Sequence, residues 1–432
     1  METLTKPAPP MVDSNVSTFV DTAAEISRLI CRDAIWQGPR CNFLTSTSDP
    51  AFEYAKPYFK SLEADFYAGS AGVAFFLAAL YDATGDRLVH KTALGAVRNA
   101  LATARRIQPG AALGFFSGWT GIAYAALRSG QWLNNEEVLS EGQRLLDDVA
   151  NLDLQQTGID VIDGAAGAIP ALIQLEREQP SPALRAFVIR LADQLVSRAE
   201  WSAEGCSWNT IPGANYRNLT GFAHGVAGIV NALLEAFTLT GNVHYREAAF
   251  EGLRYENSFF DQQQQNWPDF RQESQPHQPT TGEGATGPSC SCAWCHGAPG
   301  IALSRLRGYE LTRHPALRTE AETGVQTTAG QLTWDLQPNF SLCHGLAGNA
   351  DVLLEAADML QTPGYRQQAE AVGRIGQERY QKTGLWINGL YNDYQIPDFM
   401  LGMSGMGYFY LRLANPAAYQ SVLLLRSPAS GR

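Results

Sequence analysis

The chain has 432 residues, of which 45% are hydrophobic and 17% are charged, and its formal net charge is -11 at pH 7. An acidic surface attracts neither nucleic acid nor an anionic membrane, so the charge argues against both as partners. No uninterrupted apolar run of about 18 residues occurs, so we expect no membrane span.

The N-terminal residues 1–20 are polar and proline-rich and lack the apolar segment of a secretory signal. We expect them to form a disordered tail, with a single domain over 21–432. Within residues 21–60, an apolar-patterned segment that contains RLICRDAIWQ predicts the first outer helix.

A short pattern, Gly-x-x-Gly followed by an apolar run, occurs seven times. Its copies begin at Gly69, Gly118, Gly164, Gly225, Gly297, Gly345 and Gly402. The runs after the glycines are apolar nearly all round, as in buried helices, whereas the segments between them carry polar residues on one face. This repeat predicts an all-α fold, an α/α toroid of seven inner and seven outer helices.

The longest interval between repeats contains a segment rich in Gln, Pro, Gly and Thr, residues 261–289. Loops this long inside a compact domain are usually functional lids or disordered insertions. Because this loop leads directly into the cysteine-rich fifth repeat, a lid over the site and a disordered insertion both remain open.

The residues with reactive side chains occupy one register of the repeat. Counted back from the first glycine, position -1 holds Asp163, His224, His296 and His344, and position -2 holds Ala223, Cys295 and Cys343. Equivalent positions of a closed toroid lie on one ring around one cavity. The two cysteines, far apart in sequence, are therefore expected to be neighbours.

Cys295, Cys343 and His344 offer two thiols and an imidazole, the soft ligands that Zn²⁺ prefers. Three protein ligands leave one coordination position open, as a catalytic zinc site requires. A rival arrangement is Cys290-x-Cys292-x-x-Cys295, a closed structural site that would need a fourth ligand from elsewhere. The seven cysteines, in a chain without a signal segment, favour reduced thiols in the cytoplasm.

His224 lies on the same ring but has no cysteine beside it, which suits a general acid or base better than a metal ligand. The alternative is a hydrogen-bonded core histidine. The register favours Asp163 as the carboxylate of the site, because Asp160 lies nearly one helical turn earlier.

Several of these segments resemble the LanC-like family, the lanthionine synthetase cyclases. The resemblance is carried by Trp294-Cys295-His296-Gly297, Cys343-His344-Gly345, Asp160-Val-Ile-Asp-Gly164, Ala223-His224-Gly225 and Leu401 to Tyr408. Other stretches, such as CRDAIWQG, NWPDFR and SVLLLRSP, look closer to the C-terminal cyclase domain of class II (LanM-type) lanthipeptide synthetases. The dehydratase half of such a synthetase does not occur in this sequence.

The resemblance implies roles for individual residues. It assigns zinc to the two cysteines and the histidine already singled out, and it places Asp160 rather than Asp163 at the active-site aspartate. It makes His224 the acid/base and Trp294 a wall of the substrate pocket. Stand-alone cyclases of the family often have an arginine three residues before this tryptophan; here that position is Ser291, so the resemblance supplies no guanidinium to the pocket.

The function that the resemblance implies is addition of a peptide cysteine thiol to dehydroalanine or dehydrobutyrine, forming a (methyl)lanthionine thioether. The substrate would be a dehydrated precursor peptide, His224 or His296 would supply the proton for the α-carbon, and a separate dehydratase is left open as a partner. The alternatives are addition of glutathione to dehydroamino acids in damaged proteins and a non-catalytic, zinc-bound toroid that binds peptides. A glycosidase is disfavoured, because Asp160 and Asp163 are too close in sequence to face each other across a sugar.

Overall fold

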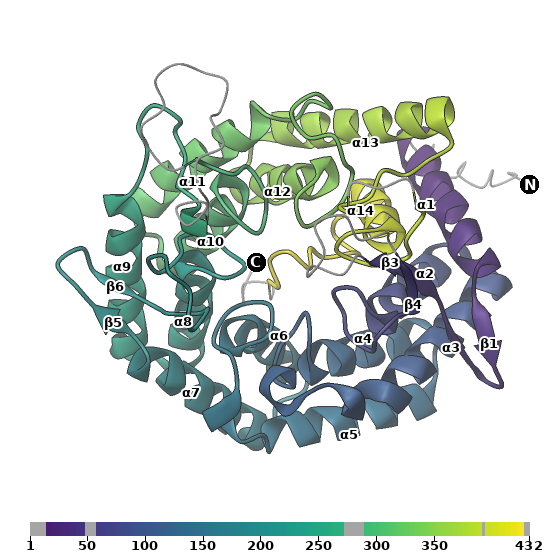
Figure 1. Cartoon of the computed structure of the whole chain (residues 1–432), viewed down its shortest axis with the longest axis horizontal. Coiled ribbons are helices and arrows are strands. Elements are labelled where there is room, and N and C mark those ends of the chain that lie inside the picture. Colours follow the sequence, from purple (N-terminus) through teal and green to yellow (C-terminus); the bar gives the residue numbers. More distant parts are fainter. Residues whose placement is uncertain (1–13, 48–57, 272–288, 391–393, 427–432) are drawn as a thin grey trace, which may run out of the picture.

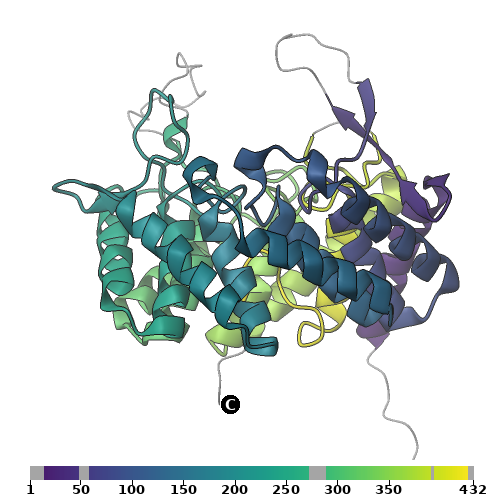
Figure 2. The same ribbon diagram turned by 90° about the horizontal axis from the view of Figure 1, so that it is seen from below.

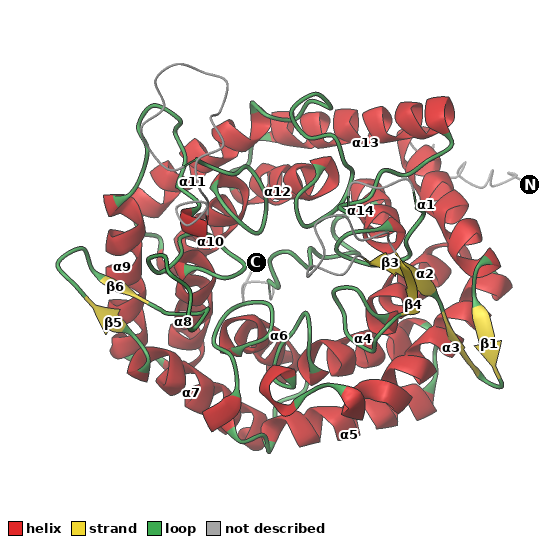
Figure 3. Ribbon diagram, in the orientation of Figure 1, coloured by secondary structure: helices red, strands yellow, loops and turns green. Residues whose placement is uncertain are grey.

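The structure is a computed structural model that describes residues 14–47, 58–271, 289–390 and 394–426. In this part of the chain, fourteen α-helices alternate between an inner and an outer ring (Figures 1 and 3). The inner helices are α2 (Ser70–Thr84), α4 (Trp119–Trp132), α6 (Ala165–Glu178), α8 (Val226–Thr240), α10 (Ala298–Thr312), α12 (Leu346–Met359) and α14 (Met403–Ala414). The outer helices are α1 (Ser14–Arg32), α3 (Arg87–Thr103), α5 (Glu136–Ala150), α7 (Pro182–Ser197), α9 (Val243–Ser258), α11 (Pro315–Ala329) and α13 (Pro363–Thr383).

Contacts between neighbouring inner helices run around the whole ring, and α14 packs against α2 to close it. Each of the first six inner helices packs on the outer helix that follows it, whereas α14 packs on α1 from the other end of the chain. The predicted α/α toroid of seven inner and seven outer helices is therefore confirmed.

Every inner helix is preceded by the first glycine of its Gly-x-x-Gly motif, in the N-cap position. The second glycine is required because the loop before the helix folds back over its first turn. A Cβ on Gly300 would lie 2.0 Å from the carbonyl oxygen of Trp294, and a Cβ on Gly348 would lie 1.8 Å from that of Leu342. In the fifth and sixth repeats, the motif therefore lets the loops that contain Cys295 and Cys343 pack on the first turns of α10 and α12.

Near the N-terminus the structure corrects two predictions. Helix α1 begins at Ser14, so the predicted tail over 1–20 extends too far; residues 1–13 lie outside the described part. The RLICRDAIWQ segment is helical only as far as Arg32, because Ile35–Gln37 forms strand β1. The chain then turns at Gly38, whose φ of 59° is a left-handed conformation that favours glycine.

Within the described ranges, three short antiparallel strand pairs lie outside the rings, and sequence reasoning did not predict them. They pair β1 (Ile35–Gln37) with β2 (Arg40–Asn42), β3 (Leu44–Thr47) with β4 (Tyr58–Ser61), and β5 (Glu200–Trp201) with β6 (Cys206–Ser207). Figure 2 shows the β3–β4 hairpin and the loops that precede the inner helices on one side of the ring, and the C-terminal segment on the other.

The centre of the ring is filled on one side by the segment after α14. Tyr419, Val422, Leu423 and Leu424 are buried there. The hydroxyl of Tyr408 donates to the carbonyl oxygen of Gln420 at 2.8 Å, which ties the segment to α14. This segment therefore covers the side of the ring opposite the helix-start loops.

The predicted lid, 261–289, is described only in part, because residues 272–288 lie outside the described part. At its base, the backbone N–H of Asp269 donates to the carbonyl oxygen of Ser289 at 3.0 Å. The prediction of a lid therefore stays untested. Separately, none of the helices in the described ranges has the length and hydropathy needed to cross a membrane.

Candidate metal centre and reaction pocket

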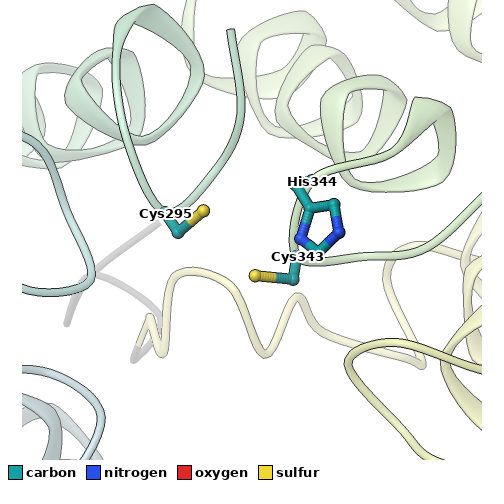
Figure 4. Close-up of side chains that lie close together, drawn as sticks. All are labelled: Cys295, Cys343 and His344. Atoms are coloured by element: carbon teal, nitrogen blue, oxygen red, sulfur yellow. The ribbon is translucent and has the colours of Figure 1, made fainter. Parts of the chain in front are cut away.

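The loops before α10 and α12 bring Cys295, Cys343 and His344 together. One donor atom from each, two sulfurs and an imidazole nitrogen, lies within 4.8 Å of the others (Figure 4). Backbone hydrogen bonds hold these loops to their neighbours in the ring, for example from the N–H of Ala223 to the carbonyl oxygen of Cys295 at 3.2 Å and from the N–H of Cys343 to that of Met400 at 3.0 Å. The predicted convergence of the two cysteines is borne out.

The orientation of His344 suits a metal ligand. Its Nε2–H donates to the carbonyl oxygen of Gly389 at 2.8 Å, so Nδ1 is the nitrogen with a lone pair for a metal. The Cys343 thiol donates a hydrogen bond to Cys295, which holds the pKa of Cys295 well below its usual range although burial opposes this. A pair of adjacent sulfurs that favours a thiolate, together with an oriented imidazole, fits Zn²⁺.

The rival cysteine arrangement does not form. The metal-compatible cluster among the described residues contains neither Cys290 nor Cys292. Burial raises the pKa of both thiols to about 12, which disfavours the thiolate that a metal needs. Asn349 Nδ2 donates to the backbone carbonyl of Cys292 at 3.0 Å, so this residue has a structural place in the loop.

His224 pairs with Asp160. Its Nδ1 lies 2.5 Å from Oδ2 of that carboxylate, which is 4% exposed. The other oxygen of Asp160 accepts the backbone N–H of Asp163 at 2.9 Å. Burial and the adjacent Asp160 carboxyl raise the pKa of Asp163 itself to about 7. The geometry therefore couples Asp160 to the histidine, whereas register alone had favoured Asp163.

His296 lies beside His224, with the two rings stacked at a centroid distance of 6.0 Å. Burial lowers the pKa of His296 to about 4, which keeps its ring neutral near pH 7. Burial also acts to lower the pKa of His224, but the hydrogen bond and charge of Asp160 outweigh it, and the net shift is upward. The pKa values of two adjacent imidazoles are thus shifted in opposite directions, a pattern that separates acid from base roles in active sites.

A cavity of about 980 Å³ connects these groups. Its walls include Cys295, Cys343, His344, His224, His296 and Arg271. This volume is at the upper end of the range of about 300–1,000 Å³ for small-molecule pockets. Soft metal ligands, a histidine–carboxylate pair and space for a substrate thus occur at one place.

The sequence model of the family described as "Lanthionine synthetase C-like protein" matches residues 60–424. The chain belongs to this family. The resemblance inferred from the paired Cys-His-Gly motifs is therefore confirmed over most of the chain.

Two known proteins illustrate the similarity. "Lacticin 481/lactococcin biosynthesis protein LcnDR2" of Lactococcus lactis subsp. lactis is 26% identical over 203 residues, which are 45% of this chain and 20% of that protein. The chain therefore matches only about a fifth of that relative's length. The solved structure of "Nisin cyclase" superimposes with a TM-score of 0.67 at 16% identity, covering 96% of this chain and 98% of that one, and supports the shared fold.

One residue expected from the lanthionine synthetase C-like motif is placed differently. Trp294 was predicted to wall the pocket, but its side chain is 0% exposed and does not line the cavity. The indole packs between Phe116 and Phe222, and Nε1 donates to the carbonyl oxygen of Leu423 at 3.0 Å. Since Cys295 points into the cavity, the residue before it faces the packed centre of the ring.

Two pocket residues were missed. Tyr67 lines the cavity beside Cys343 and stands two residues before Gly69, the same register position as both cysteines. Extending the alignment to the first repeat would have found it. Arg271 also lines the cavity, although Ser291 had led us to expect no guanidinium there. Its sequence signal is the Asp-Phe-Arg at residues 269–271, within the segment 261–289.

Proposed function

We propose that the chain is a zinc-dependent lanthipeptide cyclase. In this proposal a cysteine thiol of a dehydrated precursor peptide adds to dehydroalanine or dehydrobutyrine and forms a lanthionine or methyllanthionine ring. The observation that carries it is that Cys295, Cys343, His344 and His224 line one cavity of about 980 Å³, in which His224 is paired with the buried Asp160 behind it. Membership of the lanthionine synthetase C-like family supports the same conclusion.

Cys295, Cys343 and His344 would hold the zinc. A zinc ion bound there would lower the pKa of a cysteine thiol that enters its open position. The hydrogen bond from His344 to Gly389 fixes the ring before the metal arrives, so little reorganisation is needed.

His224 would supply a proton. In the overall reaction the S–H bond breaks, a C–S bond forms at the β-carbon and a C–H bond forms at the α-carbon, so no oxidant or reductant is needed. The Asp160 carboxylate raises the pKa of His224 and so favours the protonated imidazole, which would deliver a proton to the α-carbon. His296 is a second candidate for this step, although its lowered pKa makes it the weaker one.

Cysteine substitutions test the metal centre. We expect Cys295→Ala and Cys343→Ala to lose bound zinc and ring formation together, because each removes one of three ligands. Metal analysis of the purified variants and mass spectrometry of a dehydrated peptide after thiol alkylation would measure the two properties. Cys290→Ala is the matched control and should keep both.

The same experiment separates the alternatives. Loss of zinc from the Cys290→Ala variant would favour the rival Cys290-x-Cys292-x-x-Cys295 site. Full zinc loading of the unaltered chain without any thioether product would favour a non-catalytic peptide-binding toroid. Thioether formation by a chain free of metal would refute the zinc dependence.

A further inference from the structure

Arg271 is a cation in the wall of the reaction cavity that the proposed mechanism does not yet use. It shares that wall with Cys295 and His224. Its guanidinium forms a two-point ion pair with Asp269, with Nε–Oδ1 at 3.0 Å and Nη2–Oδ2 at 2.7 Å. A two-point pair fixes the plane of the guanidinium, so the position of this cation is defined rather than loose.

Asp269 is itself anchored to the segment that leads to the metal centre. Its side chain is 1% exposed, and it accepts a hydrogen bond from the Ser291 hydroxyl at 3.3 Å. Its backbone N–H donates to the carbonyl oxygen of Ser289. The side chain of Arg271 is 42% exposed, in contrast to this buried carboxylate. The buried acid therefore presents a partly exposed cation to the cavity, close to the chain that carries Cys295.

The same carboxylate faces the second imidazole. His296 Nδ1 lies 3.9 Å from Asp269 Oδ1, and His296 Nε2 is buried without a hydrogen-bond partner among the described residues. Buried polar atoms normally have a partner, so this nitrogen indicates a place for a polar group of a ligand. The peptide unit of a dehydrated residue carries such polar groups, an N–H and a carbonyl oxygen.

The charge of Arg271 reaches the reacting groups. It acts to lower the pKa of His224, although burial and Asp160 act on this imidazole more strongly. In the addition, the sulfur electron pair forms the C–S bond at the β-carbon, and the π electrons of the C=C bond move toward the carbonyl oxygen. Donors held ready at the atom where negative charge collects are among the strongest contributors to catalysis.

We propose that Arg271 is a catalytic residue that binds the carbonyl oxygen of the dehydrated residue and stabilises the enolate formed there. This inference rests on the proposed cyclase function. The enolate then collapses when the α-carbon takes a proton from His224, and Arg271 itself gains and loses no proton. Asp269 is the positioning residue that holds the guanidinium in place.

Substitution of Arg271 in the zinc-loaded protein tests the inference. With a peptide that carries one cysteine and one dehydroalanine, we expect Arg271→Gln to lower kcat about 100-fold with a small change in KM, as for loss of a donor to an oxyanion. Arg271→Lys should keep part of the rate, because lysine keeps the positive charge but lacks the paired N–H donors of the guanidinium. Zinc content and peptide affinity, measured by metal analysis and fluorescence anisotropy, should stay the same.

Asp269→Asn should have an intermediate effect, since the cation stays but loses its anchor. The double variant Asp269→Asn/Arg271→Gln should be no slower than Arg271→Gln alone, because the two residues act as one unit. Arg318→Gln is the matched control: this arginine pairs with Glu322 on the outer helix α11 and lies outside the cavity, so its loss should leave kcat unchanged.

Rescue distinguishes catalysis from folding. Guanidinium ion added at a concentration well below denaturing levels should restore part of the rate of Arg271→Ala, which a purely structural role would not allow. An unchanged kcat in Arg271→Gln, or loss of zinc in Arg271→Lys, would overturn the inference while leaving the cyclase proposal intact. Absence of any ring formation by the unaltered chain in the same assay would instead refute the proposed function, and the inference with it.

Discussion

Burial acts to lower the pKa of His224, and the Asp160 carboxylate is the main group that raises it. Because Asp160 raises the pKa of His224, the imidazole stays protonated to a higher pH than it would alone. If protonated His224 delivers the proton, the rate falls as pH rises through this raised pKa. We therefore expect Asp160→Asn to move the alkaline limb of the pH–rate profile of ring closure to lower pH, by about one unit or more.

Asp163→Asn is the comparison for this experiment. Asp163 lies next to Asp160, but no hydrogen bond joins it to His224 among the described contacts. This variant should shift the limb much less. Equal shifts in the two variants would contradict the assignment of Asp160 as the partner of the histidine.

Trp294 contributes packing rather than contact with a substrate. We expect Trp294→Phe to lower the free energy of unfolding by about 1–3 kcal/mol, through the lost hydrogen bond to Leu423 and the smaller ring. KM for the peptide should not change, because the indole does not line the cavity. Denaturant unfolding and steady-state kinetics would measure the two; Trp201→Phe, at a side chain 62% exposed, should change neither.

At the scale of elements, the second glycine of each motif lets the loop before an inner helix pack directly on the first turn of that helix. A Cβ at Gly300 would meet the Trp294 carbonyl oxygen, so Gly300→Ala must displace the backbone next to Cys295. We expect a loss of about 1–3 kcal/mol in the free energy of unfolding, together with weaker zinc binding. Calorimetry and zinc titration would show both.

The control for that substitution is Gly364→Ala on α13, where an added Cβ meets nothing within 4 Å. It should be neutral or stabilising, by up to about 1 kcal/mol, since alanine favours a helix over glycine. Normal zinc affinity in Gly300→Ala would contradict the link between the motif and the metal centre.

The hairpins and the start of α1 show which elements the sequence could not reveal. The Gly-x-x-Gly repeat predicted every inner helix, because the start of each one is determined locally by a tight turn and an apolar run. The first outer helix was extended through Ile35–Gln37, since an apolar run of that length fits a helix or a strand equally well. Ile35–Gln37 forms a strand because it pairs with Arg40–Asn42, and the turn at Gly38 makes this pairing possible.

At the scale of the whole molecule, ring closure explains why the metal ligands were predictable and two other pocket features were not. Equivalent repeat positions share one ring in any closed toroid, so Cys295, Cys343 and His344 converge by symmetry. The burial of Trp294 depends instead on the C-terminal segment that fills the centre. The position of Arg271 depends on the hydrogen bond between Asp269 and Ser289, which are far apart within one repeat. Neither this contact nor that of Trp294 with Leu423 recurs from repeat to repeat, so the alignment of repeats could not reveal them.

Buried ion pairs also hold neighbouring inner helices together, as at the contact between α12 and α14, which we call the α12–α14 seam. Arg412 on α14 pairs with Asp351 and Glu355 on α12, and it donates to the carbonyl oxygen of Tyr419 at 3.1 Å. All three charged side chains are buried or nearly so. Arg412→Met would leave the buried Asp351 without its cation and Glu355 with Arg426 alone, so we expect a loss of about 3–5 kcal/mol in the free energy of unfolding.

Because α12, α14 and α2 are consecutive members of the inner ring, loosening the α12–α14 seam should lower the temperature of one cooperative transition rather than create a second one. Scanning calorimetry would measure this. Arg144→Met, at a side chain 70% exposed, is the control and should change stability by less than about 0.5 kcal/mol. Zinc content of the folded Arg412→Met protein should be normal, since Arg412, Asp351 and Glu355 do not line the cavity. A selective loss of zinc at full stability would mean that the buried charges act on the site itself.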